Sequence, residues 1–97
     1  MIASFGNRAT EDLYHGRKSK AARRLPSEIV SVALRKLDMI SAAQTLQDLM
    51  SPPGNRLEPL RGNLSGYHSI RINDQWRIVF RWSAGEAHSV RIADYHS

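Results

Sequence analysis

Apolar residues in the first half of the chain recur at the spacing of an amphipathic helix. Residues 26–28 (Pro-Ser-Glu) form a typical helix start, with a proline in the first turn and an acid near the positive end of the helix dipole. The side chains that recur three and four residues apart are Leu25, Ile29, Val32, Ala33, Leu37 and Ile40. Arg35, Lys36 and Asp38 lie off this stripe. The pattern predicts a helix with one buried face and one charged face.

Shorter segments on either side of this helix carry further signals. Residues 2–5 are predicted as a short strand, and Thr10, which precedes two acids, is the expected N-cap of a first helix. Residues 41–44 (Ser-Ala-Ala-Gln) resemble a capping box and predict a short helix that carries Leu46, Leu49 and Met50. Residues 52–54 (Pro-Pro-Gly) should end that helix, because proline has no amide donor.

The second half changes from helical spacing to the alternation of strands. Apolar and polar side chains alternate in three segments, residues 68–72, 76–82 and 87–93. Residues 73–75 and 83–86 between them have the composition of hairpin turns, and a polar loop over residues 55–66 comes first. Helices followed by an antiparallel meander predict an α+β fold, in which the N-terminal helices pack on one face of a small antiparallel sheet.

Strand alternation divides the side chains of these segments between two faces. One face is apolar and should lie under the helices; it carries Ile70, Ile72, Trp76, Ile78, Phe80, Trp82, Val90 and Ile92. We therefore interpret the two tryptophans as core residues and not as platforms for stacked bases. The other face carries Ser69, Arg71, Asn73, Arg77, Val79, Arg81, Ser89 and Arg91.

The polar face thus predicts an open surface with four arginines. Arginine suits phosphate well, because its planar fork makes two parallel charge-assisted hydrogen bonds. The alternative is an ordinary solvated face, on which arginine discourages edge pairing. Lys, Glu and Thr would serve that purpose equally well, so the arginines favour phosphate binding.

Length and charge fit a small domain that binds a polyanion. The 97 residues predict one domain over residues 1–97. The net charge of +5 attracts nucleic acid, although excess charge also keeps small proteins soluble. Basic residues concentrate in a stretch that we expect to be an exposed turn: Arg17, Lys18, Lys20, Arg23 and Arg24. With no cysteine, signal peptide or long apolar run, the expected location is cytoplasmic, with no membrane contact.

A phosphate-binding sheet serves either a passive RNA-binding surface or a nuclease. The nine acids and four histidines show no metal-ligand spacing, so we expect no metal and no cofactor. In a metal-free reaction the 2′-hydroxyl of RNA attacks the adjacent phosphorus, assisted by a base, arginines and an acid. The groups that could carry protons are Glu58, Tyr95 and His96. A chain end or an isolated loop acid is often merely solvated, which is the competing interpretation.

Three segments of the second half resemble motifs of the HigB-like branch of the RelE/ParE toxin superfamily. Residues 56–62 (Arg-Leu-Glu-Pro-Leu-Arg-Gly) resemble the loop before the sheet, residues 66–80 the central hairpin, and residues 92–96 (Ile-Ala-Asp-Tyr-His) the C-terminal signature. The resemblance implies a RelE-like fold and a toxin of a type II toxin–antitoxin pair. It also implies binding to the ribosomal A site, cleavage of messenger RNA there without metal or cofactor, and a HigA-like antitoxin with a helix-turn-helix domain.

The same resemblance implies roles for single residues. Arg61 and Arg77 would contact or stabilise the scissile phosphate. Strand alternation, and not the resemblance, adds Arg71, Arg81 and Arg91 to the predicted RNA-binding surface. The active-site tail would consist of Asp94, Tyr95 and His96, with His96 or Tyr95 handling protons. The basic stretch of residues 17–24 would contact ribosomal RNA.

This chain departs from the family pattern at two positions. Glu58 stands where some members carry a histidine that is thought to take part in catalysis, and Asn73 where some relatives have an arginine. The assignment of acid and base therefore stays open. Two other functions also stay open: a ParE-like inhibitor of DNA gyrase, against which the complete C-terminal tail argues, and a simple RNA-binding module.

Overall fold

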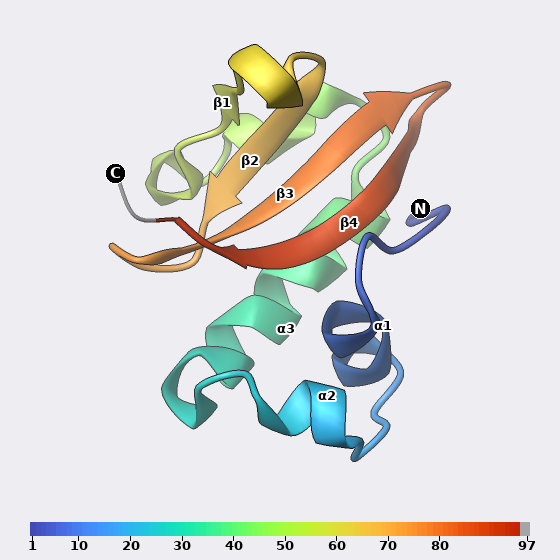
Figure 1. Cartoon of the computed structure of the whole chain (residues 1–97). Helices are drawn as coiled ribbons and strands as arrows, with labels where there is room; N and C mark the ends of the chain where they lie inside the picture. Colours follow the sequence, from blue (N-terminus) through green and yellow to red (C-terminus); the bar gives the residue numbers. More distant parts are fainter. Residues whose placement is uncertain (96–97) are drawn as a thin grey trace.

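The computed structural model describes residues 1–95, which form a group of helices and an antiparallel sheet (Figure 1). The α-helices come first and are α1 (Arg8–Tyr14), α2 (Lys20–Arg23) and α3 (Ser27–Ala42). Short 3-10 helices occupy the connections: η1 (Leu46–Met50), η2 (Pro53–Asn55) and η3 (Gly62–Leu64). The strands pair in chain order and are β1 (Glu58–Pro59), β2 (Tyr67–Arg71), β3 (Trp76–Ser83) and β4 (Glu86–Asp94). The predicted α+β class is confirmed.

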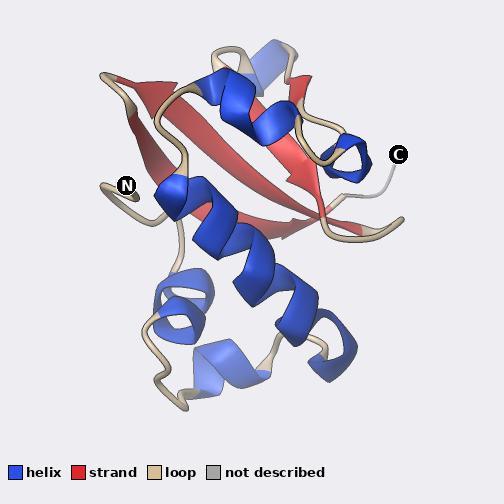
Figure 2. Cartoon of the chain, turned by 180° about the vertical axis from the view of Figure 1, so that it is seen from behind, coloured by secondary structure: helices blue, strands red, loops and turns tan. Residues whose placement is uncertain are grey.

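α3 packs its apolar stripe against one face of the sheet (Figure 2). The stripe residues that it buries are Ile29, Ala33, Leu37 and Ile40. Leu25 and Val32 pack at the margin of the same cluster, and Pro26 stands at the N-cap, so both the stripe and the helix start are confirmed. No helix among residues 1–95 combines the length and apolarity that a membrane span requires.

The apolar strand face completes this core, as predicted. Four of its side chains have no exposed surface, namely Ile70, Ile78, Phe80 and Val90. Trp76 and Trp82 pack against the cluster from its edge, which confirms that the tryptophans belong to the core. Burying a side chain of this size stabilises a fold by about 1.5–3 kcal/mol, so this cluster holds the helices on the sheet.

The predicted start of the first helix is wrong by three residues. Asn7 is the N-cap of α1, and its side chain accepts a hydrogen bond from the Thr10 amide over 2.9 Å. Thr10 is fully buried, and its hydroxyl instead accepts the Ile92 amide of β4 over 2.8 Å. The predicted strand at residues 2–5 is reduced to isolated parallel bridges from Ile2 and Phe5 to β4.

Two predicted loop features also differ in the structure. The basic stretch is not a plain turn, because the Ser19 hydroxyl accepts the Ala22 amide over 3.0 Å and so caps α2. The capping box is formed by Thr45, the N-cap of η1, and Asp48 within it, because α3 continues to Ala42 and so includes the first residues of the predicted cap. The loop of residues 55–66 includes β1, which forms the edge of the sheet.

Candidate phosphate-binding site

The strand register arranges the arginines in rows on the sheet face that α3 leaves uncovered (Figure 2). The rows across β2, β3 and β4 are Arg71–Arg77–Ala93, Ser69–Val79–Arg91 and Tyr67–Arg81–His88. Arg71 and Arg77 therefore lie directly opposite each other. Like charges in this arrangement destabilise a sheet, and an ion pair between Arg71 and the exposed Asp74 offsets part of this repulsion. The predicted assembly of four arginines on one face is confirmed.

A β-bulge changes the alternation in the first part of β4. The pairing shifts between Val79 and Arg81, and Ser89 has a φ of 53°. The N-terminal segment packs at this point: the Ser4 hydroxyl accepts the Ser89 amide over 2.8 Å, and a Cβ on Gly6 would lie only 2.6 Å from the Ser89 carbonyl oxygen. His88 consequently shares the arginine face, where strict alternation would not place it.

Arg77 is the most enclosed of the four arginines, with 8% of its surface exposed. Its Nε donates to the Ser69 hydroxyl over 2.7 Å, and a terminal nitrogen donates to the Arg56 carbonyl oxygen over 2.7 Å. We had expected an open face, and at this position the prediction is wrong. The loop carbonyl and the buried serine hydroxyl accept hydrogen bonds from the guanidinium and enclose it. Within residues 1–95 Arg77 forms no ion pair with a carboxylate. A buried cation without a counter-ion is costly, and a bound phosphate would supply the missing charge.

The turn between β2 and β3 holds the C-terminal tail beside Arg77. The Gln75 carbonyl oxygen accepts the Tyr95 amide over 2.6 Å, and the Gln75 side chain donates to Asp94 over 3.1 Å. The Tyr95 ring centroid consequently lies 5.9 Å from the Arg77 guanidinium carbon, and the tyrosine is 40% exposed. An arginine over the face of this ring would stabilise both groups. His96 lies outside the described residues.

Glu58 and Arg61 flank the site on the β1 side. Glu58 pairs with Ser69, the residue that binds Arg77, so its side chain belongs to the same sheet face. Arg61 follows β1 at the N-cap of η3 and is exposed. The structure therefore brings Glu58, Tyr95 and the arginine pair to one end of the sheet.

A buried lysine and asparagine support the loop that binds Arg77. Lys36, only 7% exposed, donates to the side chain of the fully buried Asn55, which in turn donates to the Leu49 carbonyl oxygen over 3.2 Å. Asn55 precedes Arg56, whose left-handed conformation (φ 46°) directs its carbonyl to Arg77. Burial lowers the pKa of Lys36, and the nearby Arg35 and Arg71 lower it further.

This network was not predicted, because Lys36 was interpreted as a residue of the charged face of the helix. A signal was present: position 36 lies three residues after Ala33 and four before Ile40, so it continues the buried stripe. The contact with Asn55 spans 19 residues and could not be read from local spacing.

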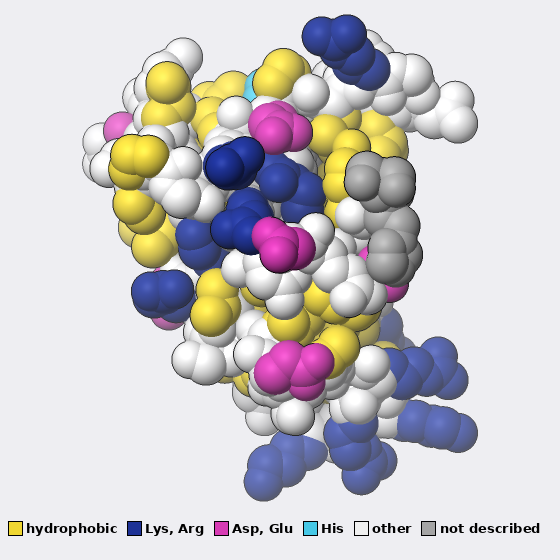
Figure 3. Space-filling model, turned by 90° about the vertical axis from the view of Figure 1, so that its left-hand side faces the viewer, with side chains coloured by type: hydrophobic (Ala, Val, Ile, Leu, Met, Phe, Trp, Pro, Cys, Tyr) yellow, Lys and Arg dark blue, Asp and Glu magenta, His cyan; other side chains and the backbone are white. Residues whose placement is uncertain are grey.

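Figure 3 shows basic side chains gathered in a hollow and at one end of the molecule, with single ones elsewhere on this face. The hollow lies on the side of the molecule that holds β1, with acidic side chains at its rim. Others project from the end that holds α1 and α2, and the basic stretch of that end is exposed: Arg17, Lys18, Lys20, Arg23 and Arg24. The structure therefore does not bring the basic stretch to the arginine site. Residues 1–95 contain no cluster of His, Asp or Glu that could hold a metal ion.

The family model described as "RelE-like toxin of type II toxin-antitoxin system HigB" matches residues 3–96. The chain belongs to this family of HigB-like toxins. It is 44% identical over 87 residues to Toxin HigB-1 of Vibrio cholerae, with 90% of each chain covered. It is 29% identical over 96 residues to Endoribonuclease HigB of Proteus vulgaris, covering 99% of this chain and 100% of that one.

Solved structures show the same fold. A chain of the YoeB-YefM complex from Staphylococcus aureus superposes with a TM-score of 0.61 at 21% identity, over 100% of the HigB-like chain and 99% of its own. The predicted family and the RelE-like fold are thus confirmed, and the protein is a toxin of a type II toxin–antitoxin system.

Proposed function

We propose that this HigB-like toxin is an endoribonuclease that cuts messenger RNA in the ribosomal A site. The observation that carries the proposal is Arg77: a nearly buried guanidinium that lies opposite Arg71, contacts Tyr95 and has no carboxylate partner within residues 1–95. Such a group is preorganised for the charge that develops on phosphate in the transition state. The name of the Proteus vulgaris relative supports the same reaction class.

The proposed reaction needs no metal or cofactor. The 2′-oxygen of the ribose forms a bond to the adjacent phosphorus, its proton passes to a base, and the bond to the 5′-oxygen breaks as an acid protonates that oxygen. The products are a 2′,3′-cyclic phosphate and a 5′-hydroxyl. Arg77 and Arg71 neutralise the phosphorane-like transition state. Glu58, Tyr95 and His96 are the candidates for base and acid.

Other basic residues bind the substrate and its carrier. Arg61, Arg81 and Arg91 contact phosphates on either side of the cut. The basic stretch at α1 and α2 contacts ribosomal RNA, which explains why the enzyme needs the ribosome. A HigA-like helix-turn-helix antitoxin is the partner that neutralises the toxin in the cytoplasm, in line with the complex that the Staphylococcus aureus relative forms.

A defined ribosome complex tests this proposal. The substrate is a 70S ribosome with an all-RNA message, compared with the same message carrying 2′-deoxynucleotides in the A-site codon, and with the naked RNA. We expect cleavage of the first only, with a cyclic-phosphate end. An intact all-RNA message would contradict the proposal and direct the next assay to DNA gyrase supercoiling. Cutting of the deoxy message would exclude attack by the 2′-hydroxyl.

A further inference from the structure

A row of three side chains crosses the arginine face at the end away from Arg77 (Figure 1). Tyr67 of β2 lies opposite Arg81 of β3, which in turn lies opposite His88 of β4. Tyr67 and His88 are half-buried, and Arg81 is exposed. Arg81 follows Arg77 by four residues of β3, which corresponds to about 13 Å along an extended strand. The row therefore lies beside the proposed site of cleavage without overlapping it.

The bulge in β4 brings His88 to this row. Regular pairing would place Ser89 opposite Arg81 and turn His88 toward the core. Ser89 instead has a φ of 53°, a left-handed conformation that strains a residue with a side chain. The Ser4 hydroxyl accepts the Ser89 amide over 2.8 Å and so helps to hold this conformation. A bulge with a strained residue commonly re-aims a side chain at a functional site.

One hydrogen bond orients the His88 ring and determines which ring nitrogen is available. Nε2 lies 3.2 Å from the Ser83 carbonyl oxygen. A carbonyl oxygen only accepts, so Nε2 carries the hydrogen of the neutral ring and Nδ1 is left as an acceptor. Within residues 1–95 Nδ1 has no hydrogen-bond partner. The ring thus offers one oriented acceptor to a ligand on the arginine face.

The three side chains together match one nucleotide of single-stranded RNA. A tyrosine ring stacks on any base, and a guanidinium binds phosphate. The acceptor on His88 distinguishes the bases, because cytosine and adenine present an amino donor where uracil and guanine present a carbonyl oxygen. An acceptor that faces such an oxygen is left without a partner, which lowers affinity.

We propose that the row Tyr67–Arg81–His88 binds a message nucleotide beside the cut and favours cytosine or adenine over uracil or guanine. Tyr67 stacks on the base, Arg81 binds its phosphate, and Nδ1 of His88 accepts a hydrogen bond from the amino group. The inference rests on the proposed RNA substrate, but its test requires no cleavage. The bulge at Ser89 is then an element of specificity, because it supplies the residue that distinguishes the bases.

The test measures the affinity of the purified toxin for 70S ribosomes that hold a message in an empty A site. The message carries 2′-deoxynucleotides in the A-site codon, so the proposed reaction cannot cut it and binding alone is measured. At each position of that codon, and at the two nucleotides on either side, a cytosine message is compared with a uracil message. These bases have the same ring size and differ in the amino and carbonyl groups.

We expect wild type to bind the cytosine message about tenfold more tightly than the uracil message at one position. His88→Phe keeps an aromatic ring without an acceptor, so the preference should fall to within about twofold. His15→Phe makes the same change at the C-cap of α1 and should leave the preference unchanged. Tyr67→Leu should weaken binding of both messages by about tenfold, whereas Tyr67→Phe, which keeps the stacking ring, should not.

Equal affinities of wild type for cytosine and uracil at every position would overturn the proposal, whether or not a variant folds. A preference that folded His88→Phe retains would overturn it as well, with the fold checked by thermal unfolding. Failure of the nuclease proposal appears separately, as an all-RNA message that stays intact in the cleavage assay while the base preference in binding persists.

Discussion

At the scale of single residues, the environment of Arg77 sets the chemistry of the site. Among residues 1–95 its hydrogen bonds go to the Ser69 hydroxyl and to the carbonyl oxygens of Arg56 and Ser69, which are neutral acceptors. Within this part of the chain the positive charge is therefore oriented but not neutralised. Arg81, four residues along the same strand and on the same face, is exposed. The two residues therefore differ in role although the sequence pattern treats them alike.

Arg77→Lys and Arg81→Lys separate these roles. Lysine keeps the charge, but it lacks the planar guanidinium that donates to the Ser69 hydroxyl and the Arg56 carbonyl oxygen at the same time. We expect Arg77→Lys to lower kcat on ribosome-bound message by about 10²-fold, the typical effect of losing one preorganised donor. Arg81→Lys should change mainly KM, by less than about tenfold, since it binds phosphate from solvent. Equal kcat values for both variants would contradict the assignment.

The residue-scale prediction from sequence succeeded where local geometry decides and failed where distant contacts decide. Alternation alone placed Arg71, Arg77, Arg81 and Arg91 on one face. It could not reveal that Arg56 and Ser69 enclose Arg77, because those contacts depend on a left-handed loop residue and on strand register. The proximity of Tyr95 to Arg77 likewise depends on the turn that binds the tail.

At the scale of elements, the short 3-10 helices and their caps fix the loops that contact the arginine side chains of the sheet. η2 carries Asn55, whose amide ties η1 and the loop before β1 together, and the next residue holds Arg77. Helix spacing and strand alternation predicted α3 and the three long strands. Four features were not predicted. The two-residue β1 and the bulge at Ser89 depend on pairing with distant segments. Asn7 and Thr45 act as caps in place of the nearby residues that we had predicted.

Asn55→Ala tests the support of the site by η2. It removes the acceptor of a buried lysine and two donors to loop carbonyls, so we expect the free energy of unfolding to fall by about 1–3 kcal/mol. Cleavage should fall as well, because the Arg56 carbonyl loses its fixed position. Asn63→Ala in the exposed η3 is the control and should change stability by less than about 0.5 kcal/mol. Urea unfolding of the two variants gives the comparison, and equal stabilities would count against the network.

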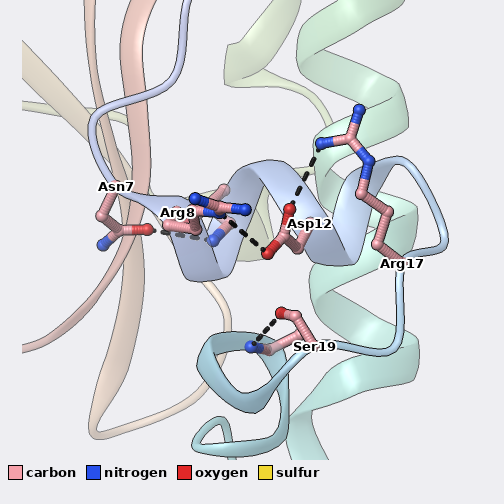
Figure 4. Close-up of polar contacts among 7 residues, drawn as sticks. Asn7, Arg8, Asp12, Arg17 and Ser19 are labelled. Atoms are coloured by element: carbon pink, nitrogen blue, oxygen red, sulfur yellow. Dashed lines mark hydrogen bonds and ion pairs between the residues drawn. The ribbon is translucent and has the colours of Figure 1, made fainter.

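Asp12→Asn tests a carboxylate that is 1% exposed and forms ion pairs with Arg8 and Arg17, at the connection between α1 and α2 (Figure 4). The Ser19 hydroxyl lowers the pKa of Asp12 most; burial raises it, and Arg17 and Arg8 lower it further. A carboxyl whose folded pKa is depressed stabilises the fold above its unfolded pKa of about 3.9, and this contribution is lost as the pH falls through the folded value. We expect the Tm of the variant to lie below wild type at pH 7 and the gap to narrow below about pH 4. A gap that is independent of pH would contradict the role of the charge.

At the scale of the whole molecule, the arginine face and the basic stretch of residues 17–24 lie at separate ends, and we propose a different RNA contact for each. The order of helices and strands sufficed to predict the α+β architecture. The separation of the basic stretch from the arginine face follows from the packing of α1 and α2 at the end away from β1, which no local pattern encodes. The net charge of +5 attracts the protein to the ribosome as a whole. We expect the arginine site to contact the message and the basic stretch at α1 and α2 to contact ribosomal RNA.

Lys20→Glu combined with Arg24→Glu tests the contact of the helical end with ribosomal RNA. Both residues are exposed. We expect weaker ribosome binding and a slope of log affinity against log salt that is shallower by about two. Cleavage at saturating toxin should be retained. Unchanged binding with the same salt slope would show that the stretch does not face RNA.

The most direct test of the central claim is to map the 5′ ends of a message in cell-free translation, by primer extension, with wild type and Arg77→Lys. We expect new ends within codons for wild type, only when ribosomes translate. These ends should be lost or strongly reduced for Arg77→Lys, with its fold checked by thermal unfolding. Ends of equal strength with the folded variant, or an intact message with wild type, would contradict the account.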